Sequence, residues 1–106
     1  MAIAAISTSP LGTEGVSVSR YVAAALRVLE ERAPELGLKY ELGPMFTTIE
    51  GPVEALFAVM QEMHQALFAA GAPRVSTVIK IDDRRDRPAT MEGKVQSVKE
   101  KLRSHE

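Results

Sequence analysis

Two glycine-proline pairs enclose one short segment of this chain and limit its structure more than any other feature does. The segment is GPMFTTIEGP, from Gly43 to Pro52. The first pair predicts a tight turn, and the residues between the pairs are mostly types that favour strands. The second pair predicts the start of a helix, because proline is favoured in the first helical turn. A turn, a strand and a helix are therefore expected in direct succession.

Hydrophobic periodicity predicts the remaining elements. Alternation of side chains predicts strands over residues 2–9, 38–42 and 74–82, beside the strand at 46–50. Helical spacing predicts a first helix over 17–32, capped by Ser17 and ended by Pro34 and Gly37. A second helix begins at Pro52, with Gly71 as its C-terminal stop, and its apolar stripe is Leu56, Phe57, Met60, Met63, His64, Leu67 and Phe68. A last helix, from about Thr90, is expected to turn Val95, Val98 and Leu102 inward.

The resulting order is β-α-β-β-α-β with an extra C-terminal helix, which is the ferredoxin-like pattern. It predicts an α+β fold for one domain over residues 1–106, with a four-stranded antiparallel sheet and two helices on one face. The residues of the other face are a mixture of apolar and small polar types. We expect another subunit or a ligand to cover them.

Composition excludes several classes of function. The formal net charge is -1, with 13 basic and 14 acidic residues, which argues against a nucleic-acid surface or attraction to an anionic membrane. An RNA-binding module of this topology would carry aromatic residues on its first and third strands, but only Phe46 is present. The chain has no cysteine, so disulfides and thiolate metal sites are excluded. The apolar N-terminus lacks a basic region and is too short for a membrane span, which indicates a cytoplasmic protein.

Several polar residues allow more than one interpretation. Glu50 is either a ligand contact or an ordinary residue at a strand end, and Ser7 is expected to pair across the sheet with Thr47 or Thr48. The run DDRRDR, Asp82 to Arg87, is interpreted as a solvated loop with internal ion pairs, a phosphate site or a subunit contact. Its carboxylates lack the spacing of a calcium loop, so no metal site is predicted. His64 is interpreted as a packing residue, and without a nucleophile-base pair no enzymatic activity is predicted.

The chain resembles the thiamine-binding family of small ferredoxin-like proteins. The matching pieces are PLGT at 10–13, VSRYVAAA at 18–25, YELGPMFTTIEG at 40–51, His64, RVSTVIKIDDRRD at 74–86 and KVQSVKEKL behind it. The resemblance implies assembly into dimers and tetramers and binding of thiamine or its hydroxymethylpyrimidine half, with no established catalysis. The residues that match the family's motif are Thr47 and Glu50 in the third strand, and Lys80, Asp82, Asp83 and Arg85 around the fourth. Phe46 replaces a small or polar residue found in many members.

The predicted function is non-catalytic binding of thiamine or its pyrimidine precursor by a homo-oligomer, without a cofactor. A carboxylate accepts from the exocyclic amino group of an aminopyrimidine, hydroxyls donate or accept, and an aromatic face suits the cationic thiazolium ring. The predicted ligand contacts are Ser7, Phe46, Thr47, Thr48, Glu50, Lys80 and Asp82. The alternative is a structural or regulatory oligomer with no small-molecule ligand.

Overall fold

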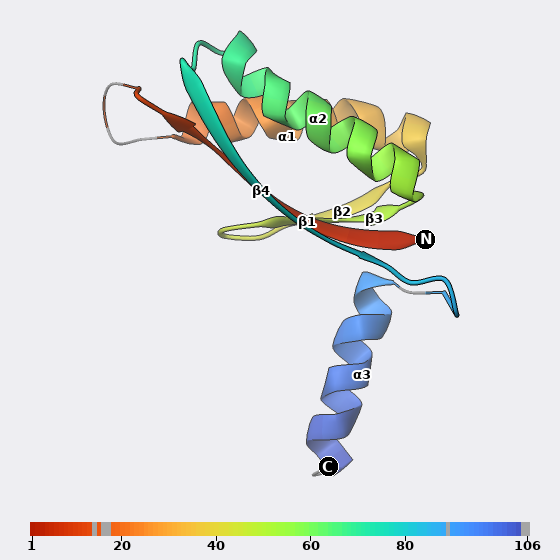
Figure 1. Cartoon of the computed structure of the whole chain (residues 1–106). Helices are drawn as coiled ribbons and strands as arrows, with labels where there is room; N and C mark the ends of the chain where they lie inside the picture. The colour runs from red at the N-terminus through yellow and green to blue at the C-terminus, as the bar shows by residue number, and fades with distance from the viewer. Residues whose placement is uncertain (14, 16–17, 89, 105–106) are drawn as a thin grey trace.

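The order of elements agrees with the sequence prediction. The computed structural model of the chain describes residues 1–13, 15, 18–88 and 90–104. Its elements are β1 (Ala2–Leu11), α1 (Ser19–Leu36), β2 (Lys39–Leu42), β3 (Thr47–Gly51), α2 (Val53–Ala69), β4 (Arg74–Asp83) and α3 (Met91–Ser104). Helices α1 and α2 lie together on one side of the sheet, and α3 extends away from the other side (Figure 1).

The four strands form one antiparallel sheet in the order β2-β3-β1-β4. The predicted ferredoxin-like α+β fold is therefore confirmed, with the first and third strands as central neighbours. We call the side of the sheet that carries α1 and α2 the helix face, and the opposite side the open face. Alternation along β1 sends Ala2, Ala4 and Ile6 to the helix face, where they are buried.

The hydrophobic core lies between the helix face and the two helices. Leu29 of α1, Ile49 of β3 and Leu56 and Leu67 of α2 are fully buried in it. Two members of the predicted α2 stripe, Phe57 and Phe68, are about half exposed instead. The apolar arc of α2 is therefore wider than the surface that the sheet and α1 offer to it.

Helix ends differ from the prediction where a proline lies near them. Helix α1 continues through Pro34 to Leu36 and ends at Gly37, whose φ of 69° is left-handed. Pro34 has no N–H to donate to the carbonyl oxygen of Glu30, yet the helix continues for two residues beyond it. Helix α2 begins at Val53, one residue after the predicted start, and Pro52 is its N-cap. The predicted cap of α1, Ser17, lies outside the described residues. None of the described helices combines the length and apolar content needed to cross a bilayer.

The C-terminal helix does not pack as predicted. Val95, Val98 and Leu102 were expected to point inward, but they are 53%, 60% and 71% exposed. Only the first turn of α3 is fastened to the sheet: Met91 is buried, and Lys94 pairs with Asp82 of β4. The remaining turns leave the sheet (Figure 1) and therefore have no surface of their own domain to cover them.

Candidate ligand site

A cavity of about 190 Å³ opens between the sheet, α1 and the hairpin that joins β2 to β3. It exists because β1 is longer than β3. Pairing of β1 with β3 ends at Ile6 and Thr47, whereas pairing of β1 with β4 continues to Leu11 and Arg74. Beyond Ile6, the edge of β1 that faces away from β4 has no ladder partner. Backbone N–H and C=O groups on such an edge are available to a ligand.

The cavity combines an apolar floor with a polar wall. Ile6, Ala25 and Met63 supply apolar surface, and Thr8 and Thr47 supply hydroxyls from the helix face. Ser7 and Ser9 also border the cavity, at the backbone edge of β1, since their side chains alternate onto the open face. The remaining lining residues are Val18, Val22, Leu26, Leu42, Gly43, Pro44, Met45 and Phe46. An apolar pocket with a few polar groups is the usual form of a small-molecule site. At about 190 Å³ the cavity is smaller than the roughly 300–1,000 Å³ of drug-sized pockets, which suits a single ring.

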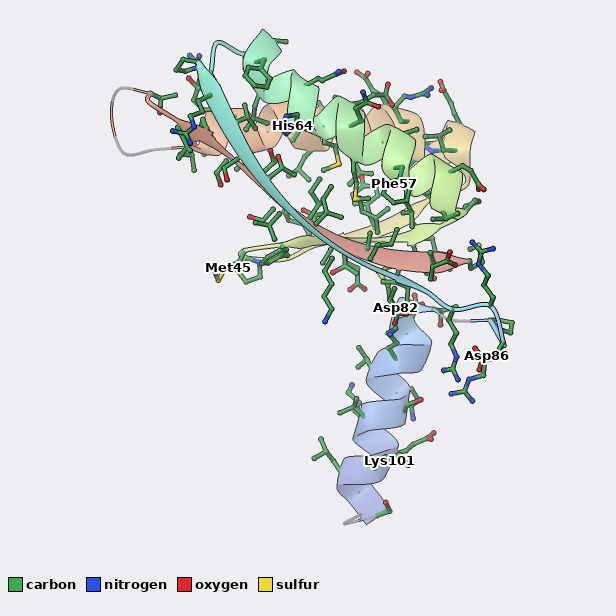
Figure 2. All side chains as sticks on the ribbon, in the orientation of Figure 1. Met45, Phe57, His64, Asp82, Asp86 and Lys101 are labelled. Atoms are coloured by element: carbon green, nitrogen blue, oxygen red, sulfur yellow. The ribbon has the colours of Figure 1, made fainter. Side chains whose placement is uncertain are left out.

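The hairpin turn holds Phe46 at the mouth of this cavity. Gly43 donates its backbone N–H to the carbonyl oxygen of Phe46 at 3.0 Å. A Cβ at position 43 would lie 2.5 Å from that oxygen, so only glycine allows this close approach. Phe46 is 38% exposed, and Met45 lies at the tip of the hairpin (Figure 2). The turn therefore presents an aromatic and a thioether side chain beside the opening.

A chain of hydrogen bonds connects the cavity wall to α2. The hydroxyls of Thr8 and Thr77, which are direct partners across β1 and β4, lie 2.7 Å apart. The Thr77 hydroxyl also lies 2.6 Å from Nδ1 of His64, whose ring meets Phe68 edge to face at a centroid separation of 5.6 Å. The interpretation of His64 as a packing residue is confirmed. Its imidazole nevertheless orients Thr77, and through it Thr8 on the cavity wall.

Three of the seven predicted ligand residues line the cavity: Ser7, Phe46 and Thr47. Thr47 is buried on the helix face, and no hydrogen bond joins its hydroxyl to another described residue. The predicted pairing of Ser7 across the sheet is wrong in register. Thr47 lies opposite Ile6 and Thr48 opposite Ala5, while Ser7 lies beyond the last β1–β3 pair. Ser7 therefore lies where the edge of β1 that faces away from β4 has no partner strand.

The other four predicted residues, Thr48, Glu50, Lys80 and Asp82, alternate onto the open face. Glu50 and Asp82 flank Ile3 in one cross-strand row, and Thr48 and Lys80 flank Ala5 in the next. The amino group of Lys94 donates to Asp82 and lowers the pKa of that carboxyl below its ordinary value. No single small ligand can therefore contact both groups of predicted residues.

Glu50 is the buried acidic residue of the open face. It is only 2% exposed, and neither carboxyl oxygen has a hydrogen-bond partner among the described residues. Buried polar groups are usually paired, because leaving one unpaired costs free energy. Its position across from Ile3, near the attachment of α3, was not apparent from the sequence.

The run DDRRDR, Asp82 to Arg87, forms the end of β4 and a loop with internal ion pairs, which was one of the three interpretations of this run. Arg84 donates to both carboxylate oxygens of Asp86, at 2.6 and 2.9 Å, and thereby lowers the pKa of Asp86 to about 2. Arg85 donates to Asp83 at 2.8 Å, and the pKa of each paired arginine is raised. The loop borders an open depression of about 660 Å³ with Met1 and the start of α2. Two of its arginines are therefore already engaged within the loop.

Thr8 and Thr77, whose hydroxyls are hydrogen-bonded to each other, were not among the predicted site residues. The signal was present, because β1 carries Ser-Thr-Ser and β4 carries Ser-Thr at positions that pair directly. Recognising it required the register between two strands that are distant in the sequence.

Comparison with known proteins identifies the family of this chain. The model of the thiamine-binding protein family matches residues 4–99. The UPF0045 protein YqgV of Bacillus subtilis is 50% identical over 102 residues, which cover 96% of this chain and 98% of that protein. The crystal structure of a hypothetical protein of Methanocaldococcus jannaschii superposes with a TM-score of 0.81 at 33% identity, covering 93% of this chain and 96% of that one. A Thermotoga maritima protein provisionally assigned to thiamine biosynthesis or salvage superposes with a TM-score of 0.73 at 26% identity, over 92% and 97% of the two chains. The chain therefore belongs to the thiamine-binding protein family.

Proposed function

We propose that this protein is a non-catalytic, homo-oligomeric binding protein for thiamine or its hydroxymethylpyrimidine half. The cavity beside the unpaired edge of β1 supports this function, since it is small, apolar at its floor and lined by hydroxyls on one wall. An aminopyrimidine presents acceptor nitrogens beside a donor amino group, and a strand edge offers complementary donors and acceptors. Membership of the thiamine-binding protein family points to the same ligand class.

In this proposal the pyrimidine ring occupies the cavity, where the Thr47 hydroxyl and the backbone of Ser7 are its contacts among the predicted residues. The cavity has room for one ring, so the thiazolium of thiamine would lie at the mouth beside Phe46. A cation over an aromatic face is stabilised by roughly 0.5–1 kcal/mol at an exposed site. Thiamine should therefore bind somewhat more tightly than the pyrimidine alone.

Calorimetric titration with thiamine and with hydroxymethylpyrimidine tests the ligand and its position together. Thr47→Val keeps the shape of the side chain but removes the hydroxyl at the cavity, and it is expected to weaken binding of both ligands about tenfold, the equivalent of one lost hydrogen bond. Thr48→Val is the matched control, because the neighbouring threonine alternates onto the open face. Phe46→Ala should weaken thiamine binding selectively, with the exposed Phe57→Ala on α2 as its control.

Two results would contradict the proposal. If neither ligand at millimolar concentration gives heat or a thermal shift, the protein does not bind them, and the alternative of a structural or regulatory oligomer stands. If Thr48→Val or Glu50→Gln abolishes binding while Thr47→Val does not, the ligand lies on the open face and the cavity is not its site.

A further inference from the structure

Helix α3 carries an apolar stripe that its own domain leaves uncovered. Met91, Val95, Val98 and Leu102 follow one another at spacings of four, three and four residues, which is the a/d pattern of a coiled coil. Met91 is buried at the sheet, whereas the other three side chains are more than half exposed. We call these four residues the α3 seam.

A helix attached in this way needs a partner. Isolated helices of about 12–15 residues are marginal in water, and α3 has 14 residues with only its first turn fastened to the sheet. Gly93 lies in that first turn, where glycine lowers helix stability by about 1 kcal/mol relative to alanine. Burial of three exposed aliphatic side chains along one face would supply the missing stabilisation.

We propose that the α3 seam packs antiparallel against the α3 seam of a second copy of this chain. This extends the homo-oligomeric part of the proposed function by naming its surface. One register sets Val95 against the partner's Val98, and Leu102 beside the first turn of the partner's α3, where Met91 is buried. The C-terminal end of each α3 then lies beside the first turn of the partner's α3.

The charges beside the seam select the antiparallel orientation. A parallel pair would set Lys94 against the partner's Lys99, which is repulsive. An antiparallel pair sets Glu92 against the partner's Lys99, twice by symmetry. On the other flank Lys94 faces the partner's Lys101, but Lys94 is already paired with Asp82, which supplies the opposite charge there.

The partner's open face is a poorer surface for this seam. Its apolar residues Ile3, Ala5 and Val78 alternate with polar ones such as Thr48 and Lys80. Burying those polar groups against valine and leucine without partners costs free energy. Docking of the α3 seam on that face is the competing arrangement.

Molar mass measured by light scattering during size-exclusion chromatography tests the interface. The wild-type chain is expected to form a dimer or a multiple of it. Val98→Glu places a charge in the seam and should halve the mass, whereas Ser97→Glu, one residue away outside the seam, should leave it unchanged.

Reversal of the flanking charges tests the same interface. Lys99→Glu should weaken assembly, and the double change Glu92→Lys with Lys99→Glu should restore it. A monomeric wild type, or a mass unaffected by Val98→Glu, would overturn the proposal.

Disulfide cross-linking tests the orientation cleanly because the chain has no cysteine of its own. Mixed Val95→Cys and Val98→Cys chains should cross-link under oxidation, while Leu102→Cys alone should not, since its two copies would be too far apart for a disulfide. Self-cross-linking of Leu102→Cys would show a parallel pair, and cross-linking of Val98→Cys only to Ser7→Cys would show docking on the sheet; both results contradict the proposal.

Titration of Val98→Glu with thiamine separates the two proposals. The cavity is on the helix face, so Val98→Glu that still binds ligand is correctly folded, and its lower mass then reports loss of the α3 interface alone. Failure of the wild type to bind either ligand would refute the proposed ligand and leave the cross-linking result unaffected.

Discussion

Glu50 shows how one side chain can lower the stability of a free chain. Its carboxyl group is buried without a hydrogen-bond partner among the described residues. Glu50→Met, of similar size, should raise the free energy of unfolding by about 1–3 kcal/mol, because it removes an unpaired polar group. Urea denaturation measures the change, and Glu41→Met, an exposed residue on the same face, should stay within about 0.5 kcal/mol. Destabilisation by Glu50→Met would mean instead that a second chain or a ligand pairs with this carboxyl group.

The sequence predicted polar and aromatic side chains at the ligand site, but it did not separate those on one face of the sheet from those on the other. Ser7, Phe46 and Thr47 do line one cavity. Thr47 and Glu50, however, are three residues apart in a strand, and an odd spacing places side chains on opposite faces. That separation was available from the sequence. The early end of β3 pairing was not, because it depends on where the hairpin turns.

At the level of elements, Thr77 joins three of them. Its hydroxyl bonds Thr8 of β1 and His64 of α2. Thr77→Val should lower the free energy of unfolding by about 1–3 kcal/mol, since it leaves two part-buried polar groups without their partner. Chemical denaturation measures this loss, with the exposed neighbour Ser76→Ala as control. Equal stability of wild type and Thr77→Val would show that water replaces the lost hydroxyl.

Elements were predicted well wherever the hydrophobic pattern has a single explanation. The alternation of Val75, Thr77, Ile79 and Ile81 allowed only a strand, and β4 is found there. The pattern of α3 has two explanations, since a helix that covers its own core and one that pairs with another chain show the same spacing. The sequence therefore identified this helix correctly and its packing incorrectly.

The whole molecule is more extended than its length requires. Its radius of gyration is 15.5 Å, against about 13 Å for a compact domain of 106 residues, and its longest dimension is 50 Å. If α3 pairs between chains, the melting temperature of the wild type should rise with protein concentration, because association stabilises the folded state. Circular dichroism over a range of concentrations measures this, and Val98→Glu should abolish the dependence. A concentration-independent wild type would indicate that α3 adds nothing to assembly.

The length of the β2–β3 hairpin has a consequence for the evolution of ligand choice. The cavity occupies the space where β3 would lie if it continued beside β1 past Thr47. Two more residues in each hairpin strand would extend the pairing to Ser7 and Thr8 and fill that space with backbone. The core between α1, α2 and the sheet would not change. Insertions and deletions at this single turn could therefore enlarge, shrink or remove the binding space while the rest of the fold is preserved.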